Sequence, residues 1–91
     1  MSAADALSDQ IRLAWKTVNW LKTNGFKPLN QQAGNFPKPV VLIEASSKCA
    51  HIQRRYGAEI IGRGVNESGA FTHWQANIDG CHVEWLETQH A

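Results

Sequence analysis

The chain has almost no excess of charge of either sign. Nine lysine and arginine residues stand against eight aspartate and glutamate residues, which leaves a formal charge of +1 in 91 residues. A domain without a net field does not gather phosphate backbones or acidic partners over long distances. The composition therefore disfavours nucleic acid as a ligand.

Long apolar runs are also missing. No stretch approaches the roughly 20 apolar residues that span a bilayer. The first 15 residues carry Asp5, Asp9 and Arg12 in place of a basic start followed by an apolar run. We therefore expect a cytoplasmic protein without membrane contact. The length and the 43% apolar content predict one globular domain, residues 1–91.

Cysteine is scarce, and its spacing does not suit a metal. Cys49 and Cys81 allow at most one disulfide, and we expect two buried thiols instead. Both lie near a histidine, and thiolate and imidazole are preferred zinc ligands. The chain has no CxxC or HxxxH pair, however, and neighbours on a strand point to opposite faces. We predict no metal site and no cofactor.

Catalytic motifs are equally absent. No serine or cysteine lies in a recognisable nucleophile motif. A phosphate-binding glycine loop is followed by the N-terminus of a helix. Gly62, Gly64 and Gly69 are instead followed by alternating apolar and polar residues, the pattern of a strand. These glycines favour a bulge and a turn. We predict no catalytic residue, and the sequence favours a non-enzymatic protein.

The most informative feature that is present is an Asp79-Gly80 pair between two segments of alternating apolar and polar residues. Such a pair predicts a β-hairpin with a two-residue loop. Counting outward, Ile78 faces Cys81 and Trp74 faces Trp85. One face of the hairpin is then apolar and the opposite face is polar.

The N-terminal segment has the pattern of an amphipathic helix. Its expected sheet-facing stripe consists of Leu7, Ile11, Ala14, Val18 and Leu21. Asn24-Gly25-Phe26 predicts a left-handed cap at the helix end, with Phe26 folded back onto Leu21.

The remaining elements follow from turn residues and β-branched runs. We expect a helix over 3–24, a loop over 26–38, a strand over 39–45, a short helix over 47–56 and strands over 58–65, 70–78 and 81–87. This predicts an α+β fold of order α-β-α-β-β-β. The long helix packs on a small, mostly antiparallel sheet of three to four strands, which the 39–45 strand joins in parallel.

A second apolar face of the long helix predicts a partner. Leu13 and Trp20 lie well away from the sheet-facing stripe, and one sheet cannot cover both faces. Leu29 and Phe36 of the loop are one candidate cover, and a second copy or another protein is the alternative. We predict a partner-binding surface formed by Leu13, Trp20, Leu29 and Phe36.

The polar face of the hairpin is the candidate ligand site. It consists of His73, Gln75, Asn77, His82 and Glu84, which together donate, accept and titrate near neutral pH. A solvated sheet face has the same alternation. The alternatives are therefore a solvent-exposed surface and a small-molecule-binding or catalytic pocket beneath the 26–38 loop.

A modest basic cluster surrounds the second helix. Lys48, Arg54, Arg55 and Arg63 compose it, and Tyr56 is close enough in sequence to stack on a base. Basic residues in a last helical turn also complement the helix dipole.

Three hypotheses for function result. The first is a binding module that self-associates or binds a protein through Leu13 and Trp20. The second is a small-molecule pocket on the polar hairpin face. The third is weak nucleic-acid binding through the basic cluster.

Overall fold

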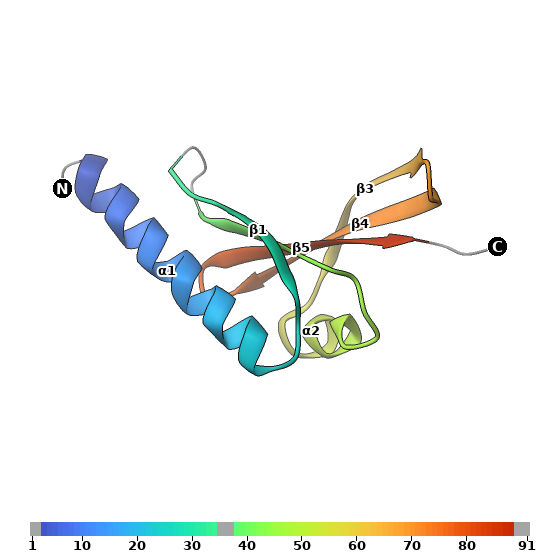
Figure 1. Ribbon diagram of the computed structural model, residues 1–91, viewed down its shortest axis with the longest axis horizontal. Helices are drawn as coiled ribbons and strands as arrows, with labels where there is room; N and C mark the ends of the chain where they lie inside the picture. Colours follow the sequence, from blue (N-terminus) through green and yellow to red (C-terminus); the bar gives the residue numbers. More distant parts are fainter. Residues whose placement is uncertain (1–2, 35–37, 89–91) are drawn as a thin grey trace.

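The structure, a computed structural model, describes residues 3–34 and 38–88 and, of helix α1, the side chains from residue 7 onward. It contains two helices and one five-stranded sheet (Figure 1). The elements are α1 (Ala3–Thr23), β1 (Pro28–Gln32), β2 (Val40–Ile43), α2 (Cys49–Tyr56), β3 (Glu59–Asn66), β4 (Gly69–Ile78) and β5 (Cys81–Thr88). The α+β class agrees with the prediction, whereas the element order and the size of the sheet do not.

The sheet is mixed, with strand order β1-β2-β5-β4-β3. The pair β2 and β5 is parallel, as expected, and the other three pairs are antiparallel. The predicted loop over 26–38 was wrong in part, because Pro28–Gln32 pairs with β2 as an edge strand. Four of its five residues are exposed, so backbone pairing forms this strand without the apolar alternation that marks a half-buried one.

The predicted hairpin register is confirmed. Ile78 pairs with Cys81 and Trp74 with Trp85. Asp79 and Gly80 both have positive φ, 51° and 90°, which a two-residue type I′ turn requires. The apolar hairpin face joins Leu21, Val41 and Ile52 in one buried cluster, so both helices cover the same face of the sheet.

Helix α1 ends as its sequence indicates. The Phe26 amide donates to the Leu21 carbonyl at 2.9 Å and the Gly25 amide donates to the Lys22 carbonyl at 3.1 Å. Gly25 has φ +85°, so these bonds form a Schellman cap. The cap turns the chain back and buries Phe26 beside the helix end.

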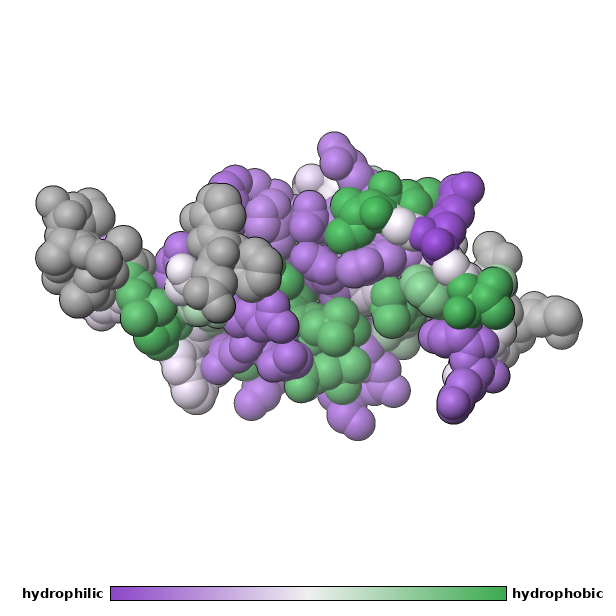
Figure 2. Space-filling view, turned by 90° about the horizontal axis from the view of Figure 1, so that it is seen from above, coloured by the Kyte–Doolittle hydropathy of each residue, from purple (hydrophilic) through white to green (hydrophobic). Residues whose placement is uncertain are grey.

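The expected sheet-facing stripe was wrong for the N-terminal half of α1. Leu7 and Ile11 are 42% and 44% exposed, whereas Ala14, Val18 and Leu21 are buried as expected. The N-terminal part of the helix extends past the edge of the sheet (Figure 1), where it contacts the segment after β1: the Gly34 amide donates to Gln10 Oε1 at 2.6 Å. Viewed from above, exposed apolar residues form several patches separated by hydrophilic ones (Figure 2).

Candidate functional site

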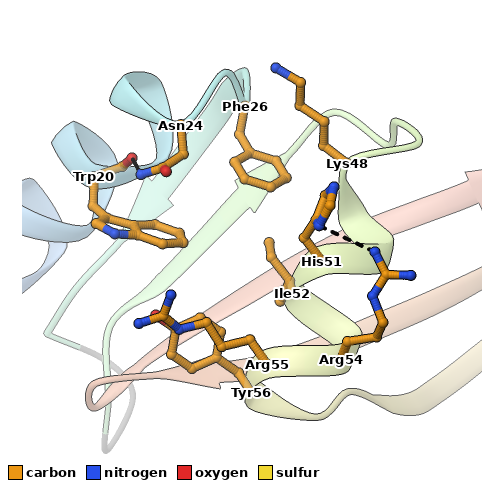
Figure 3. Close-up of a pocket in the computed structure, with 9 residues that line it drawn as sticks. All are labelled: Trp20, Asn24, Phe26, Lys48, His51, Ile52, Arg54, Arg55 and Tyr56. Atoms are coloured by element: carbon orange, nitrogen blue, oxygen red, sulfur yellow. Dashed lines mark hydrogen bonds between the residues drawn. The ribbon is translucent and has the colours of Figure 1, made fainter.

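A groove opens between the C-terminal end of α1 and the short helix α2 (Figure 3). Its volume is about 410 Å³, within the usual range of small-ligand pockets. The lining residues are Trp20, Asn24, Phe26, Lys48, His51, Ile52, Arg54, Arg55 and Tyr56. We call this the α1/α2 groove.

Aromatic rings from both helices line the groove. Trp20 lies in the last turns of α1, and the Schellman cap brings Phe26 beside it, with ring centroids 6.3 Å apart and planes 17° apart. Tyr56 ends α2 and meets Trp20 edge to face, with centroids 6.0 Å apart. Ile52, only 1% exposed, lies between the two helices (Figure 3). The groove therefore has an apolar floor and π faces on its walls.

Positive charge surrounds this aromatic wall. Lys48, Arg54 and Arg55 all line the groove, and no lining residue is acidic. The ion pairs found within residues 7–34 and 38–88 involve other side chains, so these three cations have no carboxylate partner there. The Arg55 guanidinium lies 5.5 Å from the centre of the Tyr56 ring, a cation–π contact. The groove thus combines planar apolar surface with uncompensated positive charge.

Two further contacts position the cations. Arg54 Nη2 lies 3.2 Å from His51 Nδ1. Lys48 lies against Gly25, where a β-carbon would collide with the ammonium group. The capping glycine therefore leaves room for the Lys48 side chain at the end of α1.

The structure brings together three of the four residues of the predicted basic cluster. Lys48, Arg54 and Arg55 share the α1/α2 groove. Arg63 lies on β3 opposite Thr72 and does not line the groove. After α2 the chain enters β3, the edge strand at the opposite end of the sheet from β1. Arg63 therefore lies apart from Lys48, Arg54 and Arg55.

The predicted partner-binding surface is not one surface. Leu13 and Trp20 are half-buried against the core, and Leu13 lies near Gly80 of the hairpin turn. Leu29 is 55% exposed on β1, and Phe36 lies outside the described residues. Self-association stays a prediction. Among the described residues, the exposed apolar side chains of α1 that could take part are Leu7, Ile11 and Trp15.

The polar hairpin face forms a second hollow, on the side of the sheet opposite the core. Its volume is about 360 Å³, and its lining is Asn30, Gln32, Val40, Leu42, Phe71, His73, Glu84 and Leu86. His73 Nε2 lies 2.7 Å from Glu84 Oε1, and Gln75 Nε2 donates to Glu84 Oε2 at 3.1 Å. Both carboxylate oxygens are therefore engaged within the face. We call this the outer hollow.

Three of the five predicted ligand residues, Gln75, Asn77 and His82, do not line the outer hollow. The Asn77 side chain accepts from the Gly80 amide at 3.0 Å and so stabilises the turn. His82 borders another depression, beside Gln75 and Asn77, and its Nδ1 is buried without a partner in the described part of the chain. The predicted five-residue set thus separates into a bonded trio of His73, Gln75 and Glu84 and two residues beside it.

The sequence interpretation missed the roles of Trp20 and Phe26 in the α1/α2 groove. The Asn24-Gly25-Phe26 cap was the available signal, because a Schellman cap places Phe26 beside the helix end. The placement of α2 against that end depends on the crossover, for which the sequence has no local signal.

Comparison with protein-family models, curated proteins and solved structures found no match. Within the described residues, no helix is both long and apolar enough to cross a bilayer. The same part of the chain places no three histidine, cysteine, aspartate or glutamate side chains together as a metal site.

Proposed function

We propose that the protein is a non-enzymatic binding module whose α1/α2 groove binds single-stranded nucleic acid. The observation that carries the proposal is that three aromatic rings and three cations without carboxylate partners in the described residues share one groove. Aromatic faces stack on exposed bases, and lysine and arginine neutralise the phosphates beside them. Proteins that bind single strands combine these two features.

The form of the groove favours a single strand over a duplex. Trp20 and Tyr56 line a recess between two helices, with the buried Ile52 beneath them. A base must leave its own stack to enter such a recess, which costs little in a single strand and several kcal/mol in a duplex. The groove volume of about 410 Å³ suits one base, with successive phosphates of the strand along the rim.

The near-zero net charge gives the protein no long-range attraction for a nucleic acid, so we expect this binding to be weak. Lys48, Arg54 and Arg55 act at contact distance, where the local arrangement matters more than the total charge. Three phosphate contacts to a single strand predict a slope of about −2 for log K against log salt concentration. Affinity then falls roughly 20-fold between about 50 and 200 mM salt.

The test is fluorescence anisotropy with a labelled oligo-dT strand at about 50 mM salt. We expect saturable binding by the wild-type protein and a loss of at least about tenfold in Arg54→Ala/Arg55→Ala. The matched control is Lys16→Ala/Arg63→Ala, which removes the same charge from exposed positions outside the groove. Absence of saturable binding, or an equal loss in the control pair, would contradict the proposal.

Stacking is tested separately from charge. Trp20→Leu keeps an apolar side chain but removes the π face, and we expect binding to weaken about tenfold. Trp15→Leu makes the same change at an exposed tryptophan that does not line the groove, and it should have no effect. Binding of free thymidine monophosphate as tight as that of the oligonucleotide would identify a nucleotide-binding protein instead.

The outer hollow supports a second candidate function, the binding of a neutral small molecule. The supporting observation is that the His73 and Glu84 side chains, 29% and 14% exposed, bond to each other inside a mostly apolar hollow. In its neutral form, a histidine that donates Nε2–H to a carboxylate keeps Nδ1 as an acceptor for a ligand hydroxyl. Titration with p-cresol, followed by amide NMR shifts, tests this. Shifts confined to Val40, Leu42 and Leu86 would support it, and their absence at millimolar concentration would end it.

A further inference from the structure

His51 and Arg54 form a pair whose hydrogen-bond direction is fixed by chemistry. They lie one turn apart on the exposed face of α2, with Arg54 Nη2 3.2 Å from His51 Nδ1. Arginine has only donors, so Arg54 donates and Nδ1 accepts. The His51 ring in this arrangement is neutral and carries its proton on Nε2.

The Nε2–H group of His51, on the side of the ring away from Arg54, is available to a ligand. Among the described residues, the hydrogen bond to Arg54 is the one found for the His51 ring, so Nε2–H has no acceptor there. The titratable side chains that line the groove around His51 are Lys48, Arg54, Arg55 and Tyr56, all from α2 or its N-cap. The α1 side adds Trp20, Asn24 and Phe26, which are uncharged. An incoming anion is the natural acceptor in such surroundings.

We infer that His51 is a phosphate-contacting residue that acts as a neutral donor, with its tautomer fixed by Arg54. This inference rests on the proposed binding of single strands. Nε2–H donates to a phosphodiester oxygen, and Arg54 shares its remaining N–H groups with the same phosphate. The base of that nucleotide then lies inward, against Trp20 and Tyr56. His51 and Arg54 therefore define the phosphate end of the groove.

A neutral contact and a charged contact differ in their response to salt. Arg54→Ala removes a charge that displaces counterions, so the salt slope of oligo-dT binding should become shallower by about 0.7. His51→Ala should weaken binding about tenfold and leave the slope unchanged, because a neutral donor releases no counterion. These measurements are made at pH about 8, where free histidine is neutral.

Rescue by a conservative variant separates a contact from a structural role. In His51→Gln the side-chain oxygen accepts from Arg54 and the amide N–H donates to the phosphate, so wild-type affinity should largely return. The control is Asn19→Gln, a polar substitution at an exposed position of α1 that does not line the groove, and it should leave oligo-dT binding unchanged. The inference fails if His51→Ala binds like the wild type, if His51→Gln is as weak as His51→Ala, or if His51→Ala changes the slope. Absence of any wild-type binding would instead overturn the proposed function itself.

Discussion

Trp74 and Trp85 lie directly opposite each other on β4 and β5, with ring centroids 6.3 Å apart and planes 15° apart. Trp85 is fully buried and Trp74 packs partly buried at the edge of the core. Neither indole N–H finds a partner within the described residues. The pair therefore stabilises the fold through packing and stacking, without a hydrogen bond.

Replacing Trp85 should lower the free energy of unfolding far more than replacing an exposed tryptophan. Trp85→Ala removes a large side chain that is 0% exposed and should lower the free energy of unfolding by about 3–5 kcal/mol. Trp15→Ala, at a position 54% exposed, should change it by less than about 0.5 kcal/mol. Urea denaturation of both variants checks this. Similar losses in the two would contradict the assignment of Trp85 to the core.

The sequence predicted this tryptophan pair because the information is local. Asp79-Gly80 fixes the loop length, and a loop of known length fixes every cross-strand partner on both strands. The α1 cap was predictable for the same reason, since Gly25 and Phe26 form it with the last turn of the helix alone.

The edge strand β1 and the contact between α1 and α2 depend on distant segments. Pro28–Gln32 becomes a strand because β2 offers a free edge, not because its own residues alternate. Likewise, Lys48, Arg54 and Arg55 form a groove only because the crossover sets α2 beside Trp20 and Phe26. The basic residues and the rings could each be identified from the sequence, but not the fact that they face each other across one groove.

Two glycines on the edge strand β3 should respond in opposite ways to alanine. A β-carbon at Gly62 would meet only His73 Cβ at 3.8 Å, so Gly62→Ala should stabilise the strand by about 0.5 kcal/mol. A β-carbon at Gly64 would lie 2.8 Å from Phe71 Cζ, so Gly64→Ala should cost about 1 kcal/mol as the ring is displaced. Thermal unfolding measures both changes.

A double-mutant cycle identifies the cause of the Gly64 effect. In a Phe71→Ala background, Gly64→Ala should lose its cost, because the ring that it displaces is gone. A cost that persists there would mean that the backbone at Gly64, and not Phe71, resists the substitution.

Alkaline pH should destabilise the fold through its two cysteines. Burial raises the pKa of both the Cys49 and the Cys81 thiol above the ordinary value of 9.0. Above that value the unfolded chain loses the thiol protons while the folded protein keeps them, so the folded state binds more protons. Stability is therefore fully present below pH 9 and falls as the pH rises through the folded-state pKa values.

The measurement is the urea midpoint at increasing pH, compared between the wild type and Cys49→Ala/Cys81→Ala. Lysine and tyrosine also titrate in this range, and the double variant retains them as an internal reference. We expect the wild type to lose stability more steeply than the variant above pH 9. Parallel curves would show that the thiols ionise as easily in the folded protein as in the unfolded chain.

Removing Glu84 should cost more than removing Glu44, an exposed acidic residue that directly follows β2. Glu84→Ala leaves His73 and Gln75 without their shared acceptor and should lower the free energy of unfolding by about 1–3 kcal/mol. Glu84→Gln keeps an acceptor oxygen and should cost less. Glu44→Ala is the matched control, because Glu44 pairs with Lys27 across 3.8 Å where both side chains are more than half exposed. That pair should contribute no more than about 0.5 kcal/mol. Chemical denaturation of the three variants measures the free energy of unfolding of each. If Glu84→Ala loses no more stability than Glu44→Ala, the hydrogen bonds among His73, Gln75 and Glu84 add nothing to stability.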